Sequence, residues 1–341
     1  VGVFRSDCRY AGGEILDADG HRCAARLDSA AARRELLEHC TGKQLSGGAL
    51  LHAGFFLGPR AFYAALREMP DAEKRQFLLQ GISFVNELAG PQRALKIAQR
   101  REARFINTTM MMTLLGAAVS DGLADGRVVS GVGGQYNFVA MGHALPGARS
   151  ILALRSTRNA ADGRVQSNIV WNYAHTTIPR HLRDIVITEY GIADLRGKTD
   201  EQVIAALLEI TDSRFQEELR QQAVRAGKLA PTHRIGEAHR GNDPQTLQRR
   251  FALARARGLF SEFPFGTDLT KQEVELAGAL TRLKRSTGNR WSALRATASA
   301  LAQWGTPPAC AAALERMQLT APRTRQEWLW QRLLVRELRQ R

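Results

Sequence analysis

The sequence predicts an α/β fold with an α-helical extension at its C-terminal end. From residue 49 onward, short apolar runs rich in β-branched residues alternate with amphipathic stretches of helical periodicity. A glycine-rich string at residues 130–138 lies between a strand pattern and a helix pattern. After Thr270 only helical patterns remain, over residues 271–284, 291–304, 308–317 and 325–339.

The individual elements follow from local patterns. Apolar or β-branched runs predict strands at residues 49–56, 82–85, 103–109, 112–115, 128–130, 150–155, 168–171 and 184–189. Helical periodicity and breakers predict helices at residues 59–69, 93–101, 137–144, 200–210 and 214–229. The first 47 residues show the weakest pattern, with turns at 10–14 and 17–20 and helix-forming composition at 27–40. We therefore divide the chain into an N-terminal segment (1–47), an α/β domain (48–285) and a basic helical tail (286–341).

Composition limits the class of protein. The net charge of +15 comes mostly from arginine, and it suits nucleic acid or a small molecule that carries several phosphates. No apolar run approaches the ~20 residues that cross a bilayer, and no charged-then-apolar leader opens the chain, so we expect a cytoplasmic protein without membrane contact. The four scattered cysteines lack C-x-x-C spacing, so we predict reduced thiols and no metal site.

The glycine-rich string is the strongest functional signal. Gly131, Gly133 and Gly134 allow a sharp turn, and a helix that follows would aim free N–H groups at a ligand. The spacing matches neither the dinucleotide fingerprint nor a Walker A loop. From the residues alone, a phosphate cradle, a loop that holds an oxyanion and a plain structural turn all remain open.

Two separate strings carry a family resemblance. Ser-Gly-Val-Gly-Gly-Gln-x-x-Phe at 130–138 is followed at 188–197 by Thr-Glu-Tyr-Gly-Ile-Ala-Asp-Leu-Arg-Gly. They resemble the C-terminal domain of the acetyl-CoA hydrolase/CoA-transferase family, which includes the 4-hydroxybutyrate, succinyl and propionyl CoA-transferases. The likeness runs from roughly His52 to Lys228 and more weakly to Lys284.

The resemblance implies a fold, substrates and an assembly. The fold is a Rossmann-like open sheet of the CoA-transferase type. Acyl-CoA and a small carboxylic acid are the implied substrates, with no tightly bound cofactor, and family members commonly pair, which implies a homodimer. In the family, a glutamate carboxylate attacks the thioester and forms a mixed anhydride, and the thiolate then returns to give a glutamyl–CoA thioester. An acceptor carboxylate, or water in a hydrolase, completes the cycle.

The resemblance also implies site residues. The Gly134 backbone N–H and the Asn86 side-chain amide correspond to the oxyanion donors, since Phe84-Val85-Asn86 matches the family's strand-end Val-Asn. Without the family, Asn86 reads as a turn or helix-cap asparagine. The positions that match coenzyme A-binding segments are Gly131, Gly133, Gly134, Gln135, Thr177 and Arg180.

The chain departs from the family pattern at the nucleophilic glutamate. In the family it lies in an earlier string, Glu-Met/Leu-x-x-Asp-Gly, which precedes an Ala-Gly-Ile/Val segment. Val1-Gly2-Val3 resembles that later segment, which predicts a nucleophile upstream and makes this chain the C-terminal half of a two-domain enzyme. Glu14 offers a rival alignment with one extra residue before Asp19-Gly20, and its alternative role is a turn carboxylate.

Three functions therefore stay open. The chain is part of a CoA-transferase or acyl-CoA hydrolase, or a non-catalytic CoA- or partner-binding module without the nucleophile. An arginine-rich nucleic-acid binder is disfavoured, because charge is the only feature of such proteins that the sequence meets. The sequence separates neither transferase from hydrolase nor one carboxylic acid from another.

Overall fold

The computed structural model describes residues 4–5, 7–42, 47–160, 162–264, 266–288, 290–302 and 305–339. The chain divides into two compact units. The first comprises Val1–Gly58, Phe62–Ser156 and Ser167–Leu247, and the second comprises Pro59–Ala61, Thr157–Gln166 and Gln248–Arg341.

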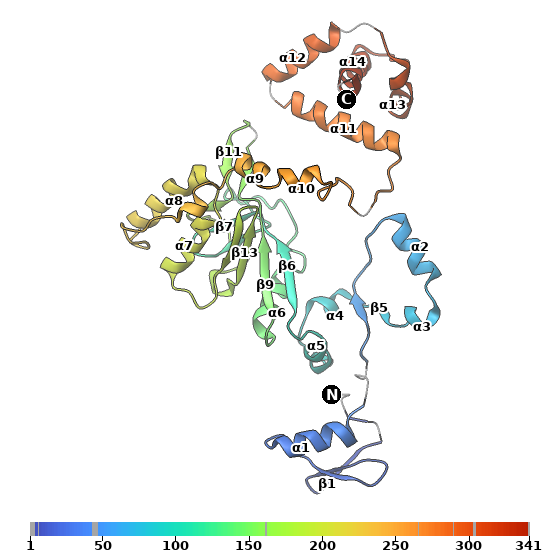
Figure 1. Cartoon of the computed structure of the whole chain (residues 1–341), viewed down its shortest axis with the longest axis vertical. Helices are drawn as coiled ribbons and strands as arrows, with labels where there is room; N and C mark the ends of the chain where they lie inside the picture. The colour runs from blue at the N-terminus through green and yellow to red at the C-terminus, as the bar shows by residue number, and fades with distance from the viewer. Residues whose placement is uncertain are drawn as a thin grey trace. The chain divides into compact units, whose positions relative to one another are not determined.

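The largest sheet of the first unit has four strands in the order β14-β13-β9-β6 (Figure 1). The strands are β6 (Arg104–Thr108), β9 (Arg149–Ala153), β13 (Ile185–Thr188) and β14 (Gly191–Asp194). β6, β9 and β13 run parallel, and β14 returns antiparallel to β13. Helix α6 (Gln135–Ala144) lies between β6 and β9 in the chain and packs against both. Such a crossover helix is what two adjacent parallel strands require.

The other strands form small sheets. One is an antiparallel sheet of β1 (Arg9–Ala11), β2 (Glu14–Leu16) and β3 (Arg22–Ala24). Another is a mixed sheet in the order β12 (Ile169–Val170), β7 (Met111–Thr113) and β8 (Ala118–Val119). Two further pairs are β4 (Leu51–Ala53) with β5 (Phe77–Leu79) and β10 (Thr157–Asn159) with β11 (Val165–Ser167). The predicted α/β class is confirmed. The single Rossmann-like open sheet is not, because the strands of the described residues are distributed over five small sheets.

Helices and helical turns alternate with these strands along the chain. In chain order they are α1 (Ala30–Glu35), the π-helical turn η1 (Leu36–Cys40), α2 (Arg60–Glu68), α3 (Asp71–Lys74), α4 (Ile82–Asn86), α5 (Arg93–Gln99), α6, the 3-10 turn η2 (Arg180–Leu182), α7 (Asp200–Glu209), α8 (Ser213–Arg225), the 3-10 turn η3 (Glu237–His239) and α9 (Pro244–Arg250). Strand residues such as Val186 and helix residues such as Leu207 share the main apolar core. A capping box of Thr199 and Gln202 starts α7.

The second unit ends in helices, as predicted. They are α10 (Ala252–Ala256), α11 (Lys271–Ser286), α12 (Arg290–Leu301), the 3-10 turn η4 (Pro308–Cys310), α13 (Ala311–Arg316) and α14 (Arg325–Arg339). α14 packs against α11 and α12, and Leu276, Leu314 and Leu334 lie in one buried cluster. Positions 303–304 of the predicted helix lie outside the described residues. None of the helices described is long and apolar enough to cross a membrane.

Three local predictions differ from the structure. Residues 82–85 form helix α4 in place of a strand, because a four-residue apolar run fits either element and tertiary contacts decide. Residues 128–130 form no ladder, since the N–H groups of Val129 and Ser130 both donate to the Asp121 carbonyl. The turn-rich start contains strands, because Gly12 and Gly13, both at positive φ, make the two-residue turn of a β1–β2 hairpin.

Candidate functional site

The glycine-rich loop leads directly into helix α6. Gly133 has a φ of +57°, a backbone conformation that is strained for any residue with a side chain. Gly134 is the N-cap residue of the helix. Within the described chain, the Gly134 N–H has no hydrogen-bond partner, as expected for the start of a helix. The Gln135 side chain is buried, and its amide donates to the Thr108 carbonyl at the end of β6 (3.0 Å). Gln135 therefore ties the loop to the sheet.

The structure brings the two predicted oxyanion donors together. The Asn86 Nδ2 lies 2.6 Å from the point where a Cβ on Gly134 would stand. Since a Cβ is about 2.5 Å from its own backbone nitrogen, the two donor nitrogens are at most about 5 Å apart. Two donors that each bind one oxygen at about 2.9 Å can be no more than about 6 Å apart, so this spacing fits a shared oxyanion. The Asn86 side chain is half-buried and makes no hydrogen bond to any residue described.

Two cations, Lys96 of α5 and Arg100 directly after it, bind backbone carbonyls on either side of Asn86. Lys96 is buried and donates to the Glu87 carbonyl (2.6 Å), and its ammonium lies 4.7 Å from the centre of the Phe84 ring. Arg100 donates to the carbonyls of Phe84 (3.2 Å) and Val85 (3.1 Å). Both therefore satisfy the orphan carbonyls at the end of α4.

Burial lowers the pKa of Lys96, with the nearby Arg100 as the second cause, and burial also lowers the pKa of Arg100. Sequence reasoning missed both residues. On an amphipathic helix, lysine and arginine usually mark the solvated face, so no local pattern distinguishes these two.

Two cavities flank the contact between Asn86 and Gly134. One, of about 320 Å³, is lined by Asn86, Glu87, Leu88, Ala89, Tyr136, Asn137, Ala140, Met141 and Ala144. The other, of about 280 Å³, lies on the Phe84 and Phe138 side and reaches Lys96 and Arg100. The first has a largely apolar wall with an amide at one end, which suits a short acyl chain.

Asp121 connects the predicted CoA loop around Thr177 to the glycine-rich loop. Its carboxylate accepts hydrogen bonds from the Thr177 hydroxyl and from His175 (3.0 Å). Its backbone carbonyl accepts the N–H groups of Val129 (2.8 Å) and Ser130 (3.3 Å). The Thr177 hydroxyl, followed by His175, lowers the pKa of Asp121 below its ordinary value. Asp121 is a third residue that sequence reasoning missed.

Arg180 lies in a different place from the glycine-rich loop. The His143 Nε2 at the end of α6 is 2.9 Å from the Leu182 carbonyl of η2, the turn that carries Arg180. Gly134 is at the opposite end of α6, and a ten-residue helix is about 15 Å long. The structure thus places Arg180 about one helix length from Gly134 and the neighbouring Asn86.

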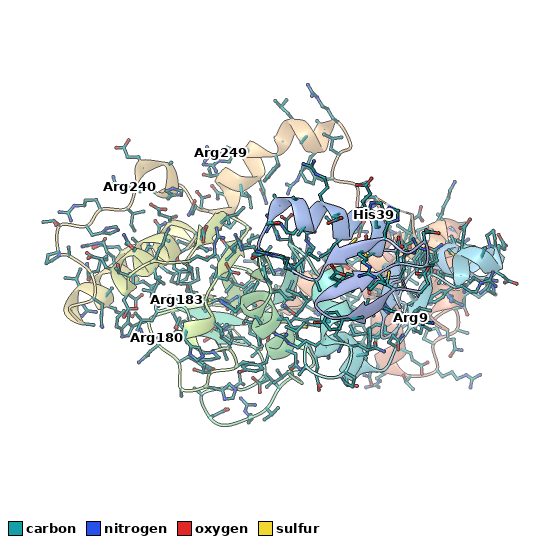
Figure 2. The ribbon with its side chains drawn as sticks, turned by 90° about the horizontal axis from the view of Figure 1, so that it is seen from below. Arg9, His39, Arg180, Arg183, Arg240 and Arg249 are labelled. Atoms are coloured by element: carbon teal, nitrogen blue, oxygen red, sulfur yellow. The ribbon has the colours of Figure 1, made fainter. Side chains whose placement is uncertain are left out.

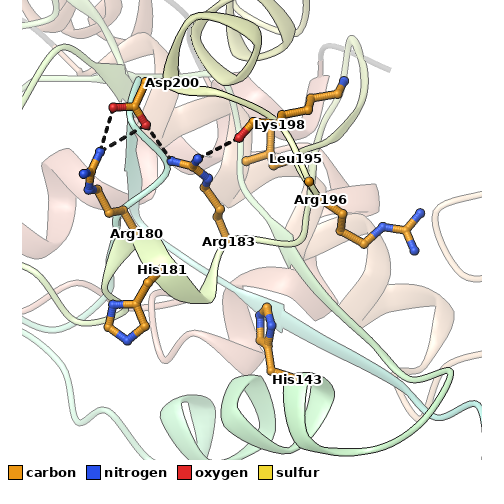
Figure 3. Close-up of a pocket in the computed structure, with 9 residues that line it drawn as sticks. His143, Arg180, His181, Arg183, Leu195, Arg196, Lys198 and Asp200 are labelled. Carbon is orange, nitrogen blue, oxygen red and sulfur yellow. Dashed lines mark hydrogen bonds and ion pairs between the residues drawn. The ribbon is translucent and has the colours of Figure 1, made fainter.

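Arg180 and Arg183 lie close together in Figure 2 and belong to a basic pocket of about 490 Å³ (Figure 3). Its other lining residues are His143, His181, Leu195, Arg196, Gly197, Lys198 and Asp200. Asp200 accepts hydrogen bonds from Arg180 (3.0 Å) and Arg183 (3.1 Å). These bonds, chiefly that of Arg180, lower the pKa of Asp200. The pocket is therefore cationic, with one carboxylate that orients two guanidinium groups.

Glu14 lies on β2, next to the two-residue turn. Its carboxylate is 3.6 Å from the Arg22 guanidinium on the neighbouring strand, and it is half-exposed. The structure thus gives Glu14 an ion-pair partner within its own sheet. Val1-Gly2-Val3, the basis of the alternative alignment, lies outside the described residues.

Comparison with known proteins identifies the α/β segment. Residues 58–223 match the acetyl-CoA hydrolase/transferase C-terminal domain. This segment is therefore similar to the C-terminal domain of that family, and the predicted resemblance is confirmed.

Curated relatives are CoA-transferases. A 4-hydroxybutyrate coenzyme A transferase of Clostridium kluyveri is 30% identical over 176 residues, which cover 50% of this chain and 38% of that protein. A succinyl-CoA:cyclohexane-1-carboxylate CoA transferase of Geobacter metallireducens is 29% identical over 178 residues, 52% of this chain and 38% of that protein. This chain thus spans less than half the length of these relatives.

Two solved structures are similar to part of the chain. RipA from Yersinia pestis is 30% identical and superposes with a TM-score of 0.43 over 52% of this chain and 37% of that one. A 4-hydroxybutyrate CoA-transferase from Porphyromonas gingivalis is 22% identical, with a TM-score of 0.37 over 57% and 48% of the two chains.

Proposed function

We propose that this chain supplies the oxyanion and coenzyme A half of an enzyme that transfers CoA between carboxylic acids. The observation that carries the proposal is the contact between the Asn86 amide and Gly134 at the start of α6. Both groups have an N–H without a hydrogen-bond partner among the residues described, and both lie in the segment that is similar to the acetyl-CoA hydrolase/transferase C-terminal domain.

In the proposed reaction, a glutamate carboxylate attacks the thioester carbonyl carbon. The C–S bond breaks, a mixed anhydride forms, and CoA leaves as the thiolate. The thiolate attacks the glutamyl carbonyl, which releases the first acid and leaves a glutamyl–CoA thioester. An acceptor carboxylate repeats the sequence in reverse, or water hydrolyses the thioester. Each attack places negative charge on a carbonyl oxygen, and the Asn86 and Gly134 donors stabilise that charge.

We further propose that the basic pocket binds a phosphate of CoA. Arg180 and Arg183 present planar donor groups whose orientation Asp200 fixes. Lys198 adds a further positive charge to the pocket, whereas Arg196 is ion-paired with Asp194. Coenzyme A is long enough to reach from a thioester at Gly134 to a pocket one helix length away. Thr177 lies on the segment that connects the two places and has its hydroxyl bound to Asp121.

The test uses the whole chain with three readouts. Calorimetric titration measures CoA binding. Exchange of label between acetyl-CoA and ¹³C-acetate measures transfer, and thiol release from acetyl-CoA measures hydrolysis. Gly134→Ala is the site variant, and Gly241→Ala is its matched control, because a Cβ at Gly241 meets only one ordinary contact at 3.9 Å.

The outcomes separate the alternatives. CoA binding without turnover, reduced in Gly134→Ala but not in Gly241→Ala, supports the half-enzyme proposal. Exchange or thiol release by the chain alone would place a working nucleophile within it, and Glu14→Gln would then test the rival alignment. A folded chain that neither binds CoA nor turns over acetyl-CoA overturns the proposal.

A further inference from the structure

The described part of residues 4–42 forms a small layered unit, which we name the N-terminal module. It consists of the antiparallel strands β1–β3 and the helix α1 with its continuation η1. Its ends meet, since Phe4 bridges Thr41 and the Arg5 N–H donates to the Cys40 carbonyl (2.8 Å). The proposed CoA chemistry uses no residue of this module apart from Glu14 in the rival alignment.

Three side chains with metal-binding atoms meet on the module. Asp17 and His21 come from the turn between β2 and β3, and His39 comes from η1. Their candidate ligand atoms all lie within 4.8 Å of one another. The imidazole rings of His21 and His39 are stacked, with centroids 4.4 Å apart and planes 12° apart. Figure 2 labels His39 on this module. We propose that Asp17, His21 and His39 bind one zinc ion, with water in the fourth position.

The Asp17 carboxylate is held in a defined orientation. Its Oδ1 accepts the backbone N–H groups of Asp19 (3.0 Å) and His21 (2.9 Å), and its side chain is 2% exposed. Its other oxygen, Oδ2, lies 3.8 Å from the His21 Nδ1. One oxygen thus fixes the group and the other faces the histidines, which is how carboxylate ligands are usually supported.

The spacing suits a small movement onto a metal. Nitrogen and oxygen ligands bind tetrahedral zinc at about 2.1 Å, which places ligand atoms about 3.4 Å apart. The candidate ligand atoms lie within 4.8 Å of one another, so the widest separation needs to close by little more than 1 Å. Because the stacked rings aim their nitrogen lone pairs in nearly parallel planes, one ring must also turn before both can bind one ion. The His21 side chain is 60% exposed, so its rotation meets little resistance. Two imidazoles and one carboxylate are a ligand set that zinc accepts.

The thiols of the module are a poorer ligand set. The Cys8 thiol donates to the Cys40 carbonyl (3.5 Å), and the Cys23 thiol donates to the Glu35 carbonyl (3.7 Å). A thiol that donates is protonated, whereas zinc binds the thiolate. These cysteines pack with Leu36 and Ile15 in the module's small core.

A metal would strengthen a module that has few apolar contacts. Its buried cluster comprises Cys23, Leu36 and Cys40, with Cys8 and Ile15 packed against them. Units of about 40 residues commonly depend on a metal or a disulfide, because so small a core offsets little chain entropy. A zinc ion at this position would tie the β2–β3 turn to the end of the helix. The prediction of no metal site rested on cysteine spacing, and an Asp-x-x-x-His string with a distant histidine gives no such signal.

The experiment measures zinc in the whole chain. The chain is dialysed against a small excess of ZnCl₂, freed of unbound metal, and analysed by elemental mass spectrometry. We expect one zinc per chain, and an affinity at least about 100-fold lower in His39→Ala and in His21→Ala. His233→Ala, a histidine outside the module, is the matched control and keeps the metal.

Cobalt substitution tests the ligand type and does not depend on any variant. Co²⁺ in this site gives visible d–d bands without a thiolate-to-cobalt charge-transfer band in the near ultraviolet. That band, or zinc retained at full affinity in both histidine variants, overturns the assignment. A wild-type chain that binds no zinc above the level of the His21→Ala variant overturns it as well. Far-ultraviolet circular dichroism of each variant reports whether a loss of metal merely reflects unfolding.

Discussion

The side-chain amide of Asn86 lies against the Cα of Gly134, with its Nδ2 2.6 Å from the place of a Cβ on that glycine. The two residues are far apart in the chain, at the end of α4 and the start of α6. Two donors meet here because Gly134 has no side chain. The same contact leaves Gly134 the least space of the loop glycines, since a Cβ at Gly131 or Gly133 would meet nothing within 4 Å. At Gly133 the φ of +57° disfavours a side chain instead.

We predict that Gly134→Ala separates the two donors. The new Cβ would stand 2.6 Å from Asn86 Nδ2 and 2.9 Å from Phe138 Cε2, so both side chains must move. We expect acyl-CoA affinity to fall at least about 10-fold while the far-ultraviolet spectrum stays unchanged. Calorimetric titration of the variant and of Gly241→Ala measures the difference. Equal affinity in both variants would contradict the role of this contact.

Asn86→Ala tests the amide itself. Removing one oxyanion donor costs about 100-fold or more in turnover in other acyl-transfer enzymes, with a smaller effect on substrate binding. We expect that split between turnover and binding in the active assembly that contains this chain, measured as label exchange and as CoA affinity. A change in affinity with unaltered turnover would make Asn86 a binding residue and remove it from the oxyanion site.

Arg100→Leu tests the hydrogen bonds between Arg100 and the end of α4. The substitution leaves the Phe84 and Val85 carbonyls without the guanidinium that now binds them. An unsatisfied buried acceptor costs about 1–3 kcal/mol, so we expect the free energy of unfolding in urea to fall by that amount. Arg101→Leu, an exposed neighbour, is the control. Equal stability of the two variants would show that the carbonyls find other partners.

The sequence predicted those helices and strands whose own residues show a clear pattern. The run at 184–189 became β13 and the periodic stretch at 200–210 became α7, because a buried strand and a capped amphipathic helix each leave a signature in their own residues. The run at 82–85 left no such signature. The carbonyls at its C-terminal end accept hydrogen bonds from Lys96 and Arg100, which are too far along the chain to contribute to a local pattern.

The residues of the candidate site were likewise predicted only in part from the sequence. Glycine spacing located the loop, but only the family resemblance connected Asn86 with Gly134, since no periodicity links residues on different elements. The supporting residues, Asp121 and Asp200, were not found because an aspartate near a glycine or at a helix start usually reads as a cap or turn residue. Residues that act through tertiary contacts require the fold to be known first.

The basic pocket makes a prediction about ligand specificity. Arg180→Gln removes a charge-assisted donor, which corresponds to a loss of about 10-fold or more in CoA affinity. The exposed Arg225→Gln is the charge-matched control, so a purely long-range effect of charge would appear in both. Titration with dephospho-CoA then identifies the phosphate. If the pocket binds the 3′-phosphate, wild type and Arg180→Gln bind dephospho-CoA with equal affinity. If the pocket binds the pyrophosphate, the variant binds both CoA and dephospho-CoA more weakly than wild type does.

Acid stability depends on carboxylates whose pKa the fold lowers, and Glu217 on α8 is the clearest case. Hydrogen bonds from Arg220, then from Gln221, lower the pKa of Glu217 to about 2. A carboxylate with a lowered pKa stabilises the folded state fully above its ordinary pKa near 4.5, and this contribution disappears as the pH falls through about 2. We therefore expect Glu217→Gln to lower stability at pH 7 by about 0.5 kcal/mol, the usual size for an exposed pair on a helix, and this effect to shrink as the pH falls toward and through about 2.

The neighbouring Glu218 provides the control for this prediction. Its carboxylate accepts a hydrogen bond from Gln222 (3.2 Å) and has no arginine partner in the described structure, so Glu218→Gln should change stability little at either pH. Urea unfolding of the two variants and the wild type between pH 7 and pH 2 gives the comparison. A deficit in Glu217→Gln that persists unchanged at pH 2 would mean that the side chain stabilises α8 through packing, because a protonated carboxyl group no longer carries the charge that Arg220 binds.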